Sequence, residues 1–103
     1  MTEYIEVADK EDIPENGSKI VEYNGERVAL FNLNGEIHAI QNTCPHAGGP
    51  LGEGSLDESI ITCPWHGWQF NVKDGASPIN PNAKVAKFNV LIDGNKIKIS
   101  RQK

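Results

Sequence analysis

Short runs of alternating apolar and polar residues recur along this chain, and Asn-Gly or Asp-Gly pairs separate several of them. Alternation with a period of two is typical of half-buried strands, and Asn-Gly favours the type I′ turn that joins hairpin strands. The predicted strands are 4–8, 18–23, 26–33, 36–41, 59–62, 68–72, 88–92 and 96–100. No run keeps a helical period over three turns. The pattern therefore predicts an all-β fold of antiparallel hairpins.

Two segments between the predicted strands carry turn-forming residues instead of an apolar pattern. Residues 42–54 contain four glycines and two prolines, which exclude a regular helix there. Residues 64–67 form a second, shorter loop. We expect both loops at one end of the fold, because binding residues often lie on loops that a rigid scaffold holds.

These two loops, together with the residue directly before the second one, contain both cysteines of the chain and two of its three histidines. They read Cys44-Pro45-His46 and Cys63-Pro64-Trp65-His66. Thiolates together with imidazoles select zinc, copper or iron–sulfur chemistry rather than magnesium or calcium. In a zinc finger the cysteines form one pair and the histidines another, whereas here each loop has one of each. This order suits a two-metal site, in which each loop sends its cysteine to one metal and its histidine to the other.

The two cysteines taken alone would also be compatible with a disulfide or with two unrelated buried thiols. Neither of these roles for Cys44 and Cys63 accounts for the two matched histidines. A structural zinc module remains an alternative. His38 lies within a predicted strand, away from the motif, and we do not expect it to be a ligand.

The four-residue motif resembles that of the Rieske 2Fe–2S family, and the similarity extends over nearly the whole chain. In that family two histidines replace two cysteines on one of the two irons. The resemblance implies that Cys44 and Cys63 bind one iron and that His46 and His66 bind the other. It also implies an antiparallel β-sandwich with two cluster-binding loops at one tip. Flanking residues that add to the resemblance are Pro45, Gly48, Gly49, Pro64, Gly67 and Trp68.

Within this family the chain resembles the soluble, low-potential branch. The high-potential membrane branch has an extra cysteine in each ligand loop, and these form a disulfide. Here Gly49 and Trp65 stand at those positions. That branch also has serine and tyrosine hydroxyls that bond to the cluster, where this chain has Trp68 and Phe70. The segment around Pro78 resembles a proline-containing loop that covers the cluster.

Length and charge limit the remaining possibilities. A chain of 103 residues is expected to form one domain, residues 1–103. The net charge of -4 disfavours binding to nucleic acid or to an anionic membrane. No apolar run approaches the roughly 18 residues that span a bilayer, and the first residues lack the pattern of an export signal. The expected location is the cytoplasm.

The resemblance implies a one-electron carrier that takes electrons from a reductase and passes them to a terminal oxygenase. Such a carrier would be monomeric when free and would not be an enzyme by itself. An alternative is the small Rieske subunit of an NADH-dependent nitrite reductase, in which a similar domain is part of an enzyme complex. The zinc module is a third possibility.

Overall fold

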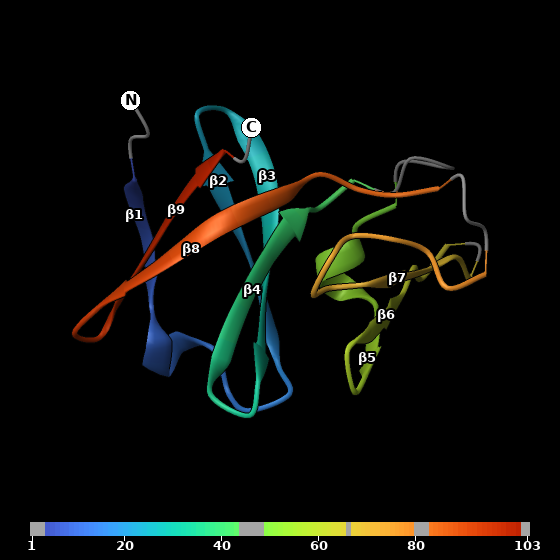
Figure 1. The fold of residues 1–103 in the computed structure, drawn as a ribbon, viewed down its shortest axis with the longest axis horizontal. Helices are drawn as coiled ribbons and strands as arrows, with labels where there is room; N and C mark the ends of the chain where they lie inside the picture. The colour runs from blue at the N-terminus through green and yellow to red at the C-terminus, as the bar shows by residue number, and fades with distance from the viewer. Residues whose placement is uncertain (1–3, 44–48, 66, 80–82, 102–103) are drawn as a thin grey trace.

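The computed structural model describes residues 4–43, 49–65, 67–79 and 83–101, and these form two antiparallel sheets (Figure 1). The larger sheet has the strand order β1-β9-β8-β4-β3-β2 and the smaller one the order β5-β6-β7. The strands of the larger sheet are β1 (Ile5–Asp9), β2 (Ser18–Tyr23), β3 (Glu26–Leu33), β4 (Glu36–Gln41), β8 (Lys87–Asp93) and β9 (Lys96–Arg101). Those of the smaller sheet are β5 (Ser55–Asp57), β6 (Ile60–Thr62) and β7 (Gln69–Asn71). Two 3-10 turns, η1 (Lys10–Asp12) and η2 (Leu51–Glu53), complete the described elements.

Two Asn-Gly turns fix the register of the neighbouring strands β2, β3 and β4. Asn24 and Gly25 have φ values of 51° and 82°, and Asn34 and Gly35 have values of 54° and 93°. A type I′ turn needs positive φ at both central residues, as these pairs show. The turns join β2 to β3 and β3 to β4 without a break in either ladder. The all-β prediction and both predicted turns are therefore confirmed. Within the described ranges, no helix is long and apolar enough to cross a membrane.

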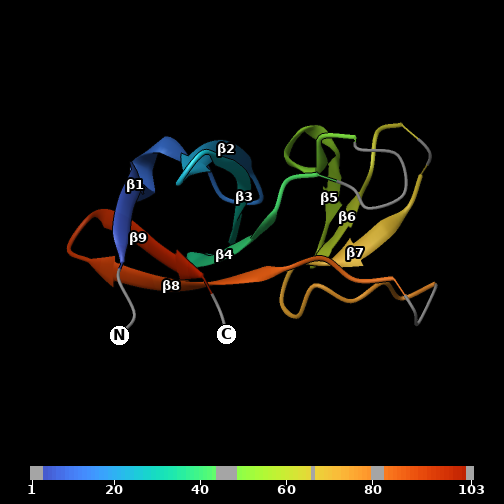
Figure 2. The ribbon, with the colours of Figure 1, turned by 90° about the horizontal axis from the view of Figure 1, so that it is seen from above.

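The larger sheet curls so that β1 comes to lie beside β2 (Figure 2). The curl encloses one hydrophobic core, to which both its first and its last strands contribute. The buried members of this first core are Ala8, Ile13, Val21, Tyr23, Val28, Leu30, Ile37, Ala39, Phe88, Ile97 and Ile99. Burial of these side chains holds the curled sheet together.

The smaller sheet packs on the outside of β3 and β4 and forms a second core there. Val28 and Leu30 of β3 belong to the first core, whereas Ala29 and Phe31 belong to the second. Strand β3 is thus apolar on both faces, since successive side chains point to opposite sides. The second core consists of Ala29, Phe31, Leu33, Ile40, Leu51, Ile61, Cys63, Phe70, Val72 and Val85. It connects the curled sheet to the part of the chain that carries the candidate ligands.

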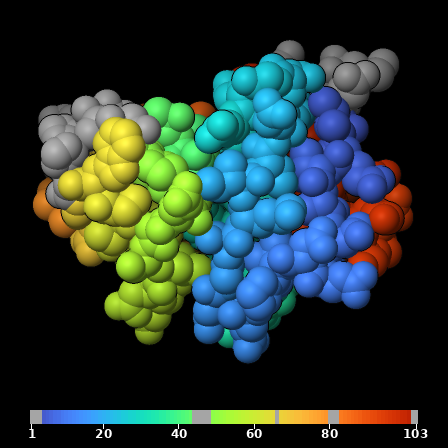
Figure 3. All heavy atoms as spheres, turned by 180° about the vertical axis from the view of Figure 1, so that it is seen from behind, coloured from blue at the N-terminus to red at the C-terminus, as the bar shows by residue number. Residues whose placement is uncertain are grey.

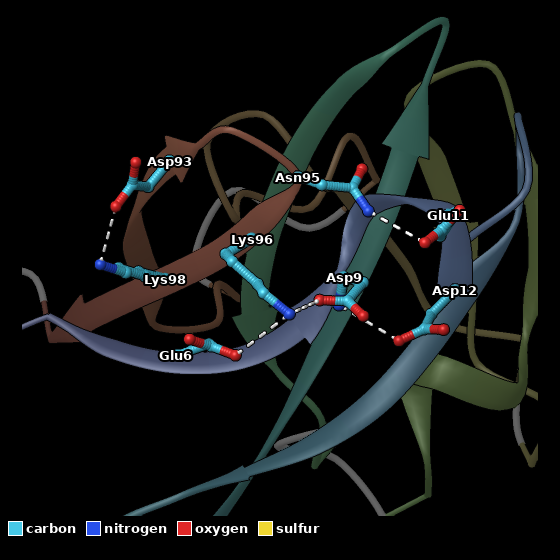
Figure 4. Close-up of polar contacts among 8 residues, drawn as sticks. All are labelled: Glu6, Asp9, Glu11, Asp12, Asp93, Asn95, Lys96 and Lys98. Atoms are coloured by element: carbon cyan, nitrogen blue, oxygen red, sulfur yellow. Dashed lines mark hydrogen bonds and ion pairs between the residues drawn. The ribbon is translucent and has the colours of Figure 1, made fainter.

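Charged side chains link β1 and η1 to the hairpin of β8 and β9 (Figure 4). The Lys96 Nζ lies 2.8 Å from Asp9 Oδ1 and 3.8 Å from Glu6 Oε2, and Asn95 Nδ2 donates to Glu11 Oε1. The hydrogen bond and charge of Asp9, with the charge of Glu6, raise the pKa of Lys96. These contacts are exposed, so they contribute little to stability.

Candidate metal centre

Cys63 is the one predicted ligand that lies among the described residues. Cys44, His46 and His66 fall outside them. Cys63 follows β6 directly, as predicted from the strand that ends there, and its side chain belongs to the second core. It is a free thiol with only 2% of its surface exposed. The thiol is therefore held on the interior side of the loop.

The chain reverses sharply after Cys63. The backbone N–H of Cys63 donates to the carbonyl of Trp68 over 2.7 Å, and the N–H of Gly67 donates to the carbonyl of Cys63 over 3.1 Å. Gly67 has a φ of 74°, in the region that glycine adopts most readily. The reversal continues the pairing of Thr62 with Gln69. The second predicted ligand loop is thus a tight turn that connects the end of β6 to the start of β7.

The two ligand loops meet at Gly49. A Cβ atom on Gly49 would lie 2.8 Å from the Cys63 Sγ, closer than real Cβ atoms come to a neighbour, and 3.0 Å from the Trp65 Cγ, tighter than most real contacts. The first loop therefore needs glycine here for space. The positions that resemble the extra cysteines of the high-potential branch, Gly49 and Trp65, lie against each other. This contact brings the described parts of the two loops together.

Buried polar groups hold the base of the first loop. Asn42 is 3% exposed, and its Oδ1 accepts the N–H of Gly52 while its carbonyl accepts the N–H of Leu51. The hydroxyl of Ser18, on β2, donates to the carbonyl of Gly52. Sequence reasoning did not single out Asn42 or Ser18. The only signal for Asn42 is the preference of asparagine for turns, where its side chain bonds to nearby backbone.

A third segment borders the first loop through Gln41. The Gln41 carboxamide donates to the Thr43 carbonyl over 2.7 Å and accepts the Ala86 N–H over 2.8 Å. Ala86 lies on the return of the segment that contains Pro78, and an isolated bridge between Ala76 and Lys84 closes that segment. Residues 80–82 are outside the described part, so the covering role of this loop stays a prediction.

The remaining aromatic and histidine candidates have identifiable neighbours. His38 Nε2 lies 2.6 Å from Glu36 Oε1 on the same strand, which fits its exclusion from the ligand set. Trp68 packs against the second core, with its ring centroid 6.5 Å from that of Phe70. Phe70 is fully buried, whereas Trp65 is 59% exposed. Trp68 thus packs the base of the loop.

A polar groove of about 790 Å³ lies elsewhere, between the turn after β3 and the turn after β5 (Figure 3). Its lining residues are Asn16, Leu33, Asn34, Glu36, Leu56, Asp57, Glu58, Ser59 and Lys73. None of these is a cysteine or a histidine. The groove is at the end of β6 away from Cys63, so it is separate from the candidate metal centre.

The described residues fit a cluster held by two loops. Cys63 would supply its sulfur from an apolar interior, and Gly49 brings the first loop close to that sulfur. Thiolate and imidazole ligands in equal number are the donor set of a Rieske centre. Cys44 and His46 enter the same loop as Gly49, and His66 enters the same turn as Cys63.

Comparison with known proteins gives the family. The Rieske [2Fe-2S] domain matches residues 3–89. The chain is 32% identical over 100 residues to the ferredoxin component of the naphthalene 1,2-dioxygenase/salicylate 5-hydroxylase systems of Ralstonia sp, covering 96% of each chain. It is 40% identical over 91 residues to Apoptosis-inducing factor 3 of Mus musculus, where the match covers 86% of this chain but only 15% of that protein.

The fold agrees with this result. The ferredoxin of carbazole 1,9a-dioxygenase from Nocardioides aromaticivorans IC177 superimposes with a TM-score of 0.89 at 26% identity, over 96% of this chain and 98% of that one. Its match, like that of the Ralstonia protein, covers almost the full length of both chains. With the buried Cys63 and the meeting of the two loops, these similarities show that the chain belongs to the Rieske [2Fe-2S] domain family, whose members carry a 2Fe–2S cluster.

Proposed function

We propose that this chain is a one-electron carrier of the cytoplasm, which takes electrons from a reductase and passes them to a terminal oxygenase. The observation that carries the proposal is the match over 96% of both chains to a ferredoxin component of an oxygenase system. The chain would act as an electron-transfer component rather than as an enzyme by itself, and it would be monomeric when free. Family membership decides against the zinc module.

The cluster, when bound, supplies the one-electron chemistry, and the protein supplies its binding and surroundings. Cys44 and Cys63 would hold one iron, and His46 and His66 the other. The second core keeps the Cys63 side chain away from water. The bonds of Asn42 to Gly52 and Leu51 fix the base of the loop that carries Cys44 and His46.

Metal and acid-labile sulfide analysis tests the cofactor. We expect about two irons and two sulfides per chain in freshly isolated protein, since a Rieske centre contains two of each. One bound zinc and no labile sulfide would contradict the proposal.

The partners need a separate experiment. The purified protein should be reduced by NAD(P)H only when an electron-donating reductase is added, and it should be reoxidised by a terminal oxygenase. Isolation of the chain in a stable complex with a large nitrite reductase subunit would instead support the small-subunit alternative.

The reduction potential should lie near the low end of the Rieske range, at about −150 mV. Two neutral imidazoles in place of two thiolates make the oxidised centre less negative, which raises the potential above that of four-cysteine clusters. At Trp68 and Phe70, however, no hydroxyl is present to stabilise the reduced cluster. A redox titration of the purified protein measures the balance. A value near +300 mV would contradict the assignment to the low-potential branch.

A further inference from the structure

Trp65 combines wide exposure with one close contact to the opposite ligand loop. Its side chain is 59% exposed, although large aromatic side chains gain most from burial. Its Cγ and Cδ2 atoms nevertheless lie only 3.0 and 3.1 Å from the point where a Cβ on Gly49 would stand. One edge of the indole therefore packs against the backbone of the first ligand loop at Gly49.

The same point is also close to the metal-binding sulfur. The Cys63 Sγ lies 2.8 Å from the Cβ position of Gly49, so sulfur and indole approach one side of one glycine. Gly49 comes from the first loop, whereas Cys63 and Trp65 come from the second. Among the described residues, this is where the two loops meet beside the thiol. The Cys63 side chain at this meeting point is 2% exposed, whereas Trp65 beside it is 59% exposed.

We propose that Trp65 is a positioning residue of the cluster. Its indole packs against the first ligand loop, holds that loop close to Cys63 and keeps water from the Cys63 sulfur. The proposal rests on the proposed function, because it concerns the bound cluster. Two consequences follow from it. Without the indole the loops part more easily, and the cluster is lost faster. Water also comes nearer the cluster and stabilises the additional negative charge of the reduced state, because the apolar shell around a metal site controls solvent access and potential.

The test uses the protein with its cluster and the variants Trp65→Ala and Trp65→Phe. Leu91→Ala is the matched control, since Leu91 is also a large exposed side chain, at 45%, but lies on β8. Two quantities are measured: the rate at which visible absorption is lost in excess chelator, and the reduction potential. Trp65→Ala should lose its cluster about five- to tenfold faster, which corresponds to a barrier lower by about 1 to 1.4 kcal/mol. Its potential should rise, Trp65→Phe should restore most of both values, and Leu91→Ala should match the unmodified protein.

A double substitution tests the contact itself. Gly49→Ala should also accelerate cluster loss, because its methyl group would press on both the sulfur and the indole. In Gly49→Ala/Trp65→Ala the indole is absent, so the combined effect should be smaller than the product of the two single effects.

Several results would overturn the inference. Equal rates and potentials for Trp65→Ala and Leu91→Ala would exclude any positioning role. Faster cluster loss with an unchanged potential would exclude the shielding of the sulfur. Independent effects of the two substitutions in the double variant would exclude the contact of Trp65 with Gly49 as the cause. Absence of iron and sulfide from the unmodified protein would instead be a failure of the proposed function.

Discussion

The variant Cys63→Ala is expected to contain no 2Fe–2S cluster. The substitution removes one of the four ligands, and the 2% exposure of this position leaves little room for a water molecule to replace the thiolate. Alanine is small and apolar, so the second core should tolerate it and the strands should still form. We therefore expect iron and sulfide contents near zero, no visible absorption and a β-type circular dichroism spectrum.

His38→Ala is the control for this experiment. It also removes a potential ligand side chain, but His38 lies on β4 beside Glu36 and is not part of the motif. This variant should keep its full iron and sulfide content. Two irons per chain in Cys63→Ala, or loss of the cluster in His38→Ala, would show that the ligand set is wrong.

The variant Gly54→Ala is expected to be strongly destabilised although its backbone conformation suits alanine. Gly54 has φ and ψ of −79° and −173°, which any residue adopts. A Cβ there would nevertheless stand only 2.0 Å from the carbonyl oxygen of Thr62. That oxygen is backbone in β6, immediately before Cys63, so it cannot swing aside as a side chain would. We expect a loss of at least about 3 kcal/mol, since overpacking of this kind is at the upper end of its usual cost.

Thermal unfolding measures the effect. For a domain of this size 3 kcal/mol corresponds to a fall in Tm of at least about 12 °C. Gly35→Ala is the matched control, because Gly35 has a φ of 93° but open space around it, so alanine there meets only backbone strain. That strain costs roughly 1–2 kcal/mol. An equal or larger fall in Gly35→Ala would show that the contact with Thr62 is not the dominant cost.

The strands that the sequence predicts best are those bounded by tight turns. The predicted ranges 18–23, 26–33 and 36–41 agree with β2, β3 and β4 residue by residue. Asn-Gly pairs define where these strands end, and alternation along them reports burial. The other predicted strands occur within one residue of their predicted bounds at each end.

Strand β5 was not predicted, and its physical basis explains why. Ser55, Leu56 and Asp57 have little strand preference, and the turn that follows places Glu58 at a φ of 57°, which is unusual for glutamate. The strand exists because β6 offers it a partner. The turn that joins the two strands consists of only Glu58 and Ser59, and it contains no Asn-Gly or Asp-Gly pair that would mark a hairpin in the sequence.

The ligand motif itself could be identified from sequence, whereas the supports around it could not. The spacing of the two Cys/His pairs indicated the chemistry, and the strand before Cys63 placed that residue correctly. The space requirement at Gly49 and at Gly54 arises from contacts with Cys63, Trp65 and Thr62. These contacts form only after folding, so a glycine-rich stretch could be recognised as a loop without showing which glycines are indispensable.

The cluster-bearing segment leaves the larger sheet and returns to it at neighbouring points. Ile40 on β4 pairs with Lys87 on β8, and the N–H of Gln41 donates to the carbonyl of Ala86. In topological terms the segment between them is an insertion whose ends are already joined by the scaffold. Its length can therefore change without altering the spacing of β4 and β8. The curled sheet could accept a different insert by grafting, provided that the insert covers Phe31 and Ile40 as the present one does.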